Sequence, residues 1–228
     1  AEGVIVQVLG TAGEPDVETA AVLANYGLEP KFKEEVIEEA RTVAAVFDQE
    51  SSDACPDDRL DLRDLLTFTI DPPDARDFDD AISLTHDPVR DEYELGVHIA
   101  DVAHFVKRDG ELDKEAHKRG NSAYLPRLVI PMLPELLSNG VCSLQEDVPR
   151  FVKSVFITYD GLGRVMGHRY HRSLIRSNKR LTYLEAQGLI DGDIDKAAKN
   201  TRATPRYTDE LQEALRACET LAKLIRQG

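Results

Sequence analysis

Five aspartates within ten residues are the strongest chemical feature of this sequence. They lie in the segment TIDPPDARDFDDAI and are Asp71, Asp74, Asp77, Asp79 and Asp80. Carboxylates this close repel one another, so the cluster costs free energy unless a cation or Arg76 compensates its charge. Hard oxygen ligands suit Mg²⁺ or Mn²⁺, and such ions activate water in phosphodiester hydrolysis. The cluster therefore indicates a metal-dependent hydrolytic site.

The alternative is a solvated acidic turn, because aspartates are common in turns. Two observations favour the metal site. Phe78, Ala81 and Ile82 join the cluster to apolar, strand-like sequence, so it is not a free acidic tail. A basic segment elsewhere in the chain is suited to a polyanion. The spacing does not match the calcium-binding loop of an EF-hand.

The basic segment is GHRYHRSLIRSNKRLTY. From Arg164 to Arg180 the sequence has six bases and no acid. Alternating bases on a strand place positive charge on one face, and Tyr170 and Tyr183 are suited to stacking on nucleic-acid bases. The alternative is a solvated strand face whose cations pair with the acidic helices of the same protein.

Strands and short helices must position both segments. Alternating or β-branched runs predict strands over residues 3–10, 65–70, 81–85, 93–100, 150–160 and 164–177. Gly161, Leu162 and Gly163 join the last two as a hairpin. The aspartates form the loop 71–80. Residues 121–138 carry three prolines and are expected to be mostly extended loop.

Helical periodicity predicts helices over residues 17–27, 33–47 and 111–120. Thr182 and Glu185 have the spacing of a capping box, and the leucines from Leu211 to Leu224 predict a C-terminal amphipathic helix. Because strands and helices do not alternate regularly, the fold class is α+β, with a mixed, largely antiparallel sheet and flanking helices.

Composition excludes several classes of protein. The 228 residues include 28 Lys and Arg against 42 Asp and Glu, a net charge of −14, and the 42% hydrophobic content is typical of a globular chain. No apolar run approaches the ~18 residues of a membrane span, and no signal peptide is evident. The cysteines Cys55, Cys142 and Cys218 lack metal-site spacing, so we expect reduced thiols in a cytoplasmic protein.

The net charge is unusual for a protein that binds nucleic acid. It is, however, unevenly distributed. Residues 14–64 hold 15 acids against five bases, whereas the basic segment holds no acid at all. The charge must therefore be read segment by segment.

Four blocks in order resemble the catalytic RNB domain of the ribonuclease II and ribonuclease R family. They are TIDPPDARDFDDAISL, YELGVHIADVAHFV, AYLPRLVIPMLPELLSNGVCSL and RSLIRSNKRLTYLEA, within residues 50–190. The resemblance implies a processive 3′→5′ exoribonuclease that hydrolyses single-stranded RNA to nucleoside 5′-monophosphates. It implies Mg²⁺, with Mn²⁺ as a substitute, no organic cofactor and no membrane partner.

The resemblance also implies roles for individual residues. The four active-site aspartates of the family match Asp71, Asp77, Asp79 and Asp80. Asp71 and Asp80 would bind Mg²⁺, Asp79 would be the most critical for hydrolysis, and Asp77 would hold the metal cluster and the RNA 3′ end. Tyr124 matches the tyrosine that stacks on the terminal nucleotide.

Three further cations fall in the last family block. Arg176, Lys179 and Arg180 are expected to contact RNA phosphates. Asp101 lies in a family block, but we expect it to cap a helical turn. His98 and His104 are expected to be packed or surface residues.

The resemblance divides the chain into three parts. Residues 1–12 would be the last strand of a cold-shock OB-fold domain, residues 13–50 a helical connector, and residues 51–228 the N-terminal part of an RNB catalytic domain. Family members continue with a further glutamate, an arginine and an S1 domain, so we expect this chain to be a fragment. A non-catalytic RNA-binding fragment of the same fold and a Ca²⁺-stabilised structural domain remain as alternatives.

Overall fold

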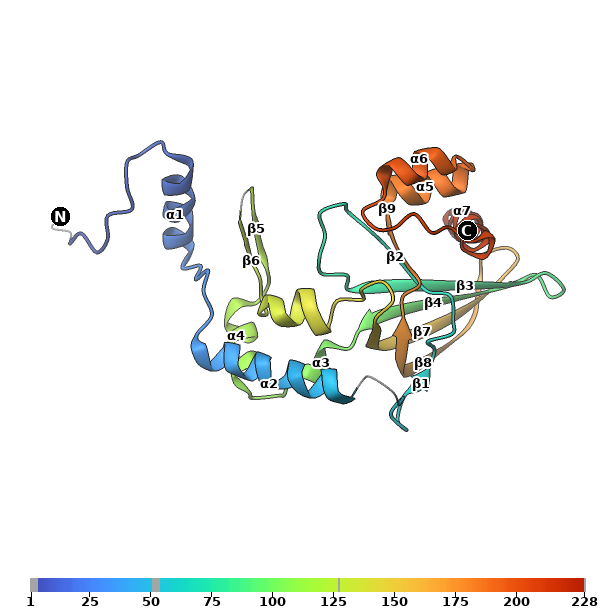
Figure 1. Ribbon diagram of the computed structural model, residues 1–228, viewed down its shortest axis with the longest axis horizontal. Coiled ribbons are helices and arrows are strands. Elements are labelled where there is room, and N and C mark those ends of the chain that lie inside the picture. Colours follow the sequence, from blue (N-terminus) through green and yellow to red (C-terminus); the bar gives the residue numbers. More distant parts are fainter. Residues whose placement is uncertain (1–3, 51–53, 127, 228) are drawn as a thin grey trace.

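A seven-stranded mixed sheet forms the centre of the molecule (Figure 1). The computed structural model describes residues 4–50, 54–126 and 128–227. The strand order is β1-β8-β7-β4-β3-β2-β9. The strands are β1 (Leu60–Asp61), β2 (Phe68–Asp71), β3 (Asp80–Asp87), β4 (Glu92–Ala100), β7 (Pro149–Asp160), β8 (Val165–Arg176) and β9 (Lys179–Thr182).

The middle of this sheet is antiparallel, and its two outer pairs are parallel. β3 pairs with β4, β4 with β7, and β7 with β8, all antiparallel. β1 joins β8 and β9 joins β2 in parallel. The predicted α+β class and the largely antiparallel sheet are confirmed, as is the predicted hairpin between β7 and β8.

Three C-terminal helices pack against the β2–β9 end of the sheet. They are α5 (Tyr183–Asp191), α6 (Ile194–Asn200) and α7 (Asp209–Gln227). Phe68, Leu181, Leu189 and Leu215 are almost fully buried in the core between these helices and the strands. The capping box at the start of α5 is confirmed, because the Glu185 N–H donates to the Thr182 hydroxyl and the Thr182 N–H donates to the Glu185 carboxylate.

A second core lies between the sheet and helices from the first half of the chain. α2 (Glu34–Glu50) buries Val36, Ala40, Ala44 and Phe47, as its periodicity predicts. Phe47 contacts the ring edges of Phe105 and Phe151 at centroid distances of 5.1 and 5.0 Å. The remaining elements on this side are α3 (Val102–Phe105), α4 (Glu111–Arg119) and the π-helical turn η1 (Leu136–Val141).

The strand predicted over residues 3–10 is wrong for residues 4–10, which have no regular secondary structure; Gly3 lies outside the described residues. Val4 and Val6 are 89% and 95% exposed. A lone strand has no partner for its backbone groups, so this segment stays irregular in this chain. It leads into α1 (Pro15–Tyr26), which ends at Gly27 with φ +63° as predicted.

Two other segments differ from prediction. The segment expected to be an extended loop forms a small hairpin, β5 (Ala123–Leu125) and β6 (Leu128–Ile130), followed by η1. The strand β9 was not predicted, and it is held by pairing with the distant β2. No helix in the described part of the chain is both long and apolar enough to cross a bilayer.

Candidate active site

Sheet pairing places the two ends of the aspartate loop side by side. Asp71 is the last residue of β2 and Asp80 is the first residue of β3. These strands are antiparallel neighbours, with Phe68 opposite Ile82. The intervening residues 72–79 therefore form a loop that connects the adjacent ends of these two strands, which confirms the predicted loop.

Backbone and hydroxyl hydrogen bonds hold the second half of this loop. The Ser143 hydroxyl donates to the Arg76 carbonyl oxygen at 2.8 Å and accepts from the Phe78 N–H at 3.1 Å. The Leu144 N–H donates to the Phe78 carbonyl oxygen at 2.9 Å. Phe78 is buried, so the backbone that carries Asp77, Asp79 and Asp80 is anchored to the protein.

The carboxylates influence one another's ionisation. Burial raises the pKa of Asp71, and the nearby charges of Asp80 and Asp77 raise it further. Partial desolvation raises the pKa of Asp79, and the charges of Asp77, Asp80 and Asp71 act in the same direction. The pKa shifts of Asp71 and Asp79 indicate that both lie within electrostatic reach of Asp77 and Asp80.

A divalent cation suits the chemistry of this donor set. The Oδ2 atom of Asp71 is buried and has no hydrogen-bond partner among the described residues, an arrangement that costs free energy until a donor or cation reaches it. Carboxylate oxygens are the ligands that Mg²⁺ and Mn²⁺ prefer. In the described ranges, however, no three His, Cys, Asp or Glu side chains are already arranged to hold a metal ion.

A cavity of about 790 Å³ lies beside the loop. The aspartate loop and the β5–β6 hairpin extend from the same side of the molecule (Figure 1). The cavity is lined by Asp71, Asp74, Asp77, Tyr124, Ser138 and Asn139, among others. The cavity therefore joins three elements that are far apart in sequence: the loop, the hairpin and η1.

Tyr124 lies on the hairpin wall of this cavity. Its hydroxyl donates a long hydrogen bond of 3.5 Å to Asp77 Oδ2. Partial burial and the charge of Asp77 raise the pKa of the phenol, so it stays protonated at neutral pH. The side chain is 70% exposed, which leaves an aromatic face open beside the aspartates.

The three predicted phosphate contacts have different positions. Arg176 is exposed at the end of β8. Lys179 is 1% exposed, and its Nζ donates to Glu146 Oε2 and to the Thr204 carbonyl oxygen, both at 3.0 Å. This burial does not suit a direct contact with a phosphate. Arg180 lies against the aspartate loop.

The cations of β8 and its turn are paired with acids of the same protein. Arg164 pairs with Asp160, Arg169 with Glu94, and Arg172 with Asp58. These three arginines therefore follow the alternative expectation that cations of the basic segment pair with acids of the same protein. Their partners, however, lie on strands and loops instead of helices. Tyr170 and Tyr183 are 72% and 59% exposed.

The predicted helix cap at Asp101 is wrong. Asp101 occupies the N-cap position of α3, but its side chain caps no backbone N–H. Its carboxylate is instead buried against the Arg59 guanidinium at 2.8 Å, with Lys153 at 3.5 Å. A buried arginine competes for the carboxylate more strongly than a backbone amide does.

Both histidines are where the sequence analysis expects them. His98 is fully buried, between the hydroxyls of Ser83 at 3.0 Å and Ser154 at 2.8 Å. Burial lowers its pKa to about 4. His104 is exposed, and its ring contacts the edges of Phe105 and Phe151.

Sequence reasoning missed Ser143 and Glu146. Neither residue has a distinctive spacing relative to the aspartates. Their contacts with the loop and with β9 form across more than 30 positions of sequence. Only the family block containing Ser143 pointed to this region.

The sheet, the anchored aspartate loop and the exposed tyrosine define an α+β domain with a candidate hydrolytic site built on carboxylates. The family model for the RNB domain matches residues 59–228. The chain therefore belongs to the RNB-domain family.

Known relatives agree with this assignment. Ribonuclease R of Chlamydia pneumoniae is 46% identical over 187 residues, which are 82% of this chain and 27% of that protein. The solved structure of apo ribonuclease R from Mycoplasma genitalium matches with a TM-score of 0.80 at 31% identity, over 97% of this chain and 32% of that one. The same enzyme in complex with ribose-methylated single-stranded RNA matches with a TM-score of 0.77 at 31% identity, over the same shares. This chain spans about a quarter to a half of the length of the first curated relatives.

Proposed function

We propose that this chain is the metal-binding half of a catalytic domain that hydrolyses single-stranded RNA from its 3′ end. The products would be nucleoside 5′-monophosphates. The observation that carries the proposal is the placement of Asp71 and Asp80 at adjacent strand ends, with Asp71, Asp77 and Tyr124 lining one cavity. The similarity to ribonuclease R supports the reaction and the substrate.

The aspartates have distinct parts in this proposal. Asp71, Asp77, Asp79 and Asp80 would hold Mg²⁺, or Mn²⁺ in its place. When bound, the ion supplies an activated water and neutralises charge on the leaving oxygen. Burial and three acidic neighbours raise the pKa of Asp79, so a nearby cation would stabilise its charged form. Asp77 also accepts from Tyr124 and so links the ligand set to the RNA-facing ring.

Tyr124 and Arg176 would contact the RNA. The open face of Tyr124 suits stacking on the terminal base, a contact that tolerates any sequence. Arg176 is an exposed cation suited to the backbone phosphates. Lys179 is not part of this proposal, because its ammonium group is buried with Glu146.

The proposal includes the division of the chain. Residues 1–12 would belong to the end of an OB-fold domain, residues 13–50 to a connector, and residues 51–228 to the catalytic domain. The irregular conformation of residues 4–10 suits a segment whose partner strands belong to another part of a longer protein. The proposal also includes a cytoplasmic location, with which the free thiols of Cys55, Cys142 and Cys218 are compatible.

A non-catalytic RNA-binding role is the second candidate. The exposed face of Tyr124 favours it, because this face suits stacking on a base whether or not the carboxylates hold a metal ion. A Ca²⁺-stabilised structural domain would use the same loop, but it gives no reason for an exposed tyrosine in the cavity.

The deciding experiment incubates the chain with 5′-labelled poly(A), with Mg²⁺ or with EDTA, beside Asp79→Asn. We expect a Mg²⁺-dependent conversion to a short end product, absent with EDTA and in the variant. RNA binding without cleavage by the wild type would support the RNA-binding candidate. Thermal stabilisation by Ca²⁺ with no RNA affinity would support the structural candidate.

A further inference from the structure

One side chain connects β9 to the first half of the aspartate loop. Arg180 lies on β9, opposite Thr69 of β2. Its Nη2 atom donates to the carbonyl oxygens of Pro73 and Ala75, both at 3.2 Å. The guanidinium group also lies over the ring of Phe78, with its carbon 4.7 Å from the ring centroid. Arg180 therefore contacts the loop at three points.

The first half of the loop has few other supports. Pro72 and Pro73 have no N–H to donate, and the Ala75 N–H donates within the loop to the Pro72 carbonyl oxygen at 3.1 Å. Within the described part of the chain, residues 72–75 are hydrogen-bonded to the rest of the protein through Arg180. Ser143 supports the second half of the loop.

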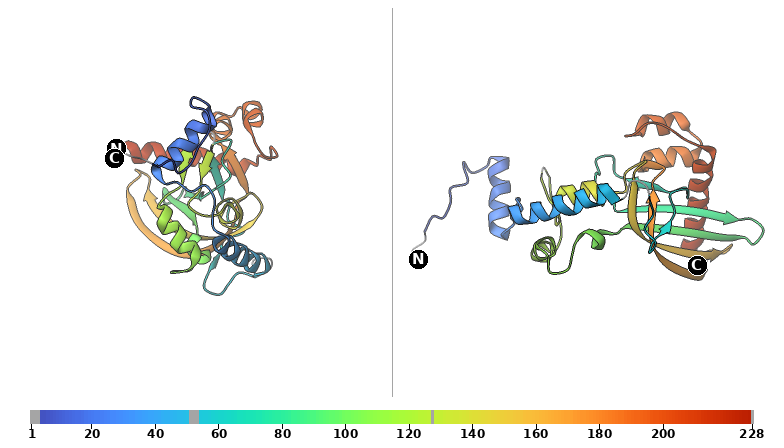
Figure 2. Two further views of the ribbon diagram at one scale, coloured as in Figure 1. Left: turned by 90° about the vertical axis from the view of Figure 1, so that its left-hand side faces the viewer. Right: turned by 60° about the horizontal axis from the view of Figure 1, so that its bottom comes forward.

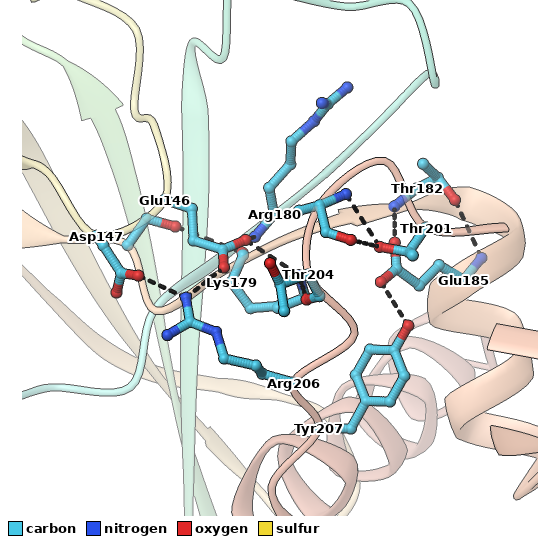
Figure 3. A network of polar contacts seen from close by, with 12 residues as sticks. Glu146, Asp147, Lys179, Arg180, Thr182, Glu185, Thr201, Thr204, Arg206 and Tyr207 are labelled. Carbon is cyan, nitrogen blue, oxygen red and sulfur yellow. Dashed lines mark hydrogen bonds and ion pairs between the residues drawn. The ribbon is translucent and has the colours of Figure 1, made fainter. Parts of the chain in front are cut away.

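Arg180 is itself held by a partly buried polar network (Figure 3). Its backbone N–H donates to Glu146 Oε2 at 3.0 Å. The Glu146 carboxylate also accepts from Lys179 at 3.0 Å and from Arg206 at 2.8 Å. Although burial opposes ionisation of Glu146, these hydrogen bonds hold its pKa below the usual range. Glu146 therefore remains an anionic anchor for the backbone of β9.

The direction of the Arg180 side chain separates it from this network. Figure 3 shows the side chain pointing away from Glu146, Lys179 and Arg206. Its Nη2 is committed to two loop carbonyls, and its Nε is buried without a hydrogen-bond partner in the described part of the chain. The Nε–Nη2 edge, one of the two edges with which arginine binds a phosphate, is therefore not open, and the Nη2 atom of the other edge is already engaged.

We propose that Arg180 is a positioning residue that holds the aspartate loop, and that it is not an RNA ligand. The effect of Arg180 on metal binding and catalysis rests on the proposed function, because the loop carries the four proposed metal ligands. Its structural content, the restraint of residues 72–80, does not depend on catalysis.

The first test measures hydrogen exchange of the loop. Peptides covering residues 72–80 are compared in the wild type, Arg180→Gln and Arg180→Lys, without metal or RNA. Loss of two hydrogen bonds from a charged donor should speed exchange in this segment about tenfold in Arg180→Gln. Arg180→Lys keeps the charge but not the planar group, so its exchange rate should be intermediate. Peptides of the β7–β8 hairpin should not change.

The matched control is Arg164→Gln, which removes the same charge from an exposed ion pair at the β7–β8 turn. It should leave exchange of the loop unchanged. Unchanged loop exchange in both Arg180 variants would overturn the proposal. If Arg180→Gln does not fold, as judged by circular dichroism, then Arg180→Lys decides, because a positioning role still requires faster exchange in the loop.

The second test separates positioning from phosphate binding. The affinity for an oligo(A) strand is measured in EDTA across a range of salt concentrations. A lost phosphate contact lowers the slope of log affinity against log salt by about 0.7. We expect Arg180→Gln to keep the wild-type slope, because a positioning residue makes no phosphate contact. A reduced slope would overturn the proposal.

The proposed function and this inference can fail separately. A wild-type chain that binds neither Mn²⁺ nor RNA would contradict the proposed function. The exchange measurement would still decide whether Arg180 holds the loop.

Discussion

At the scale of single residues, the candidate site combines charge with an open aromatic face. Tyr124 offers both a ring and a hydroxyl, and the two can be tested apart. Tyr124→Ala removes the stacking face and should weaken RNA binding by about 1–3 kcal/mol. Tyr124→Phe keeps the ring and loses only the long bond to Asp77, so its RNA affinity should match the wild type. Fluorescence anisotropy with labelled oligo(A) in EDTA measures both, and equal affinities for all three proteins would contradict a stacking role.

The burial of His98 is also a property of one residue, and it predicts a pH dependence of stability. The pKa of His98 is about 4 in the folded protein, against 6.5 for an ordinary histidine. Below pH 6.5 the unfolded chain takes up a proton that the folded protein does not. Stability should therefore fall as the pH falls from 6.5 to about 4, by on the order of 3 kcal/mol, and this contribution should level off below pH 4.

His98→Gln provides the comparison, because glutamine keeps hydrogen-bonding capacity between Ser83 and Ser154 without titrating. Urea unfolding of both proteins at pH 7 and pH 4.5 isolates the histidine, since the other titrating groups are common to both. The wild type should lose more stability than the variant over this interval. Equal losses would show that His98 does not stay neutral when buried.

At the scale of elements, the Glu146 network fastens β9 and the segment around Arg206 to the loop that precedes β7. Glu146→Ala would leave the ammonium of Lys179, 1% exposed, without its anionic partner. Removing one member of a buried pair should cost about 3–5 kcal/mol of unfolding free energy. Glu94→Ala, which breaks the more exposed pair with Arg169, should cost within about 1 kcal/mol. Urea unfolding at pH 7 checks both, and similar costs would mean that the network adds little.

Elements encoded by local patterns were predicted correctly. The β7–β8 hairpin follows from its glycines, and α5 from its capping box, because each signal lies within a few residues. The aspartate loop was found for the same reason. The parallel pairing of β9 with β2 and the burial of Lys179 depend on contacts across about 110 and 33 positions, respectively, which local spacing does not encode. The prolines of residues 121–138 led to the prediction of an extended loop where the β5–β6 hairpin forms. None of these prolines is among the paired residues of the hairpin.

At the scale of the whole molecule, the two N-terminal helices α1 and α2 differ in what they add to the core. Figure 1 and the right-hand view of Figure 2 both show α1 at the end remote from α7. No residue of α1 is buried. In contrast, α2 contributes Val36, Ala40 and Phe47 to the core between the sheet and the helices from the first half of the chain. Stability of the folded unit should therefore depend on α2 and not on the described residues that precede it.

This difference predicts where the chain can be shortened. Among the described residues, a variant that begins at residue 28 loses only exposed or half-exposed side chains, so its unfolding free energy should stay within about 0.5 kcal/mol of the full chain. A variant that begins at residue 48 loses Phe47 and the whole apolar face of α2. Because removing one large aromatic side chain from a core already costs about 3–5 kcal/mol, this variant should be severely destabilised. Urea unfolding of the three proteins compares them, and a large loss on removing residues 1–27 alone would contradict this prediction and show that α1 or the residues before it contribute to the folded unit.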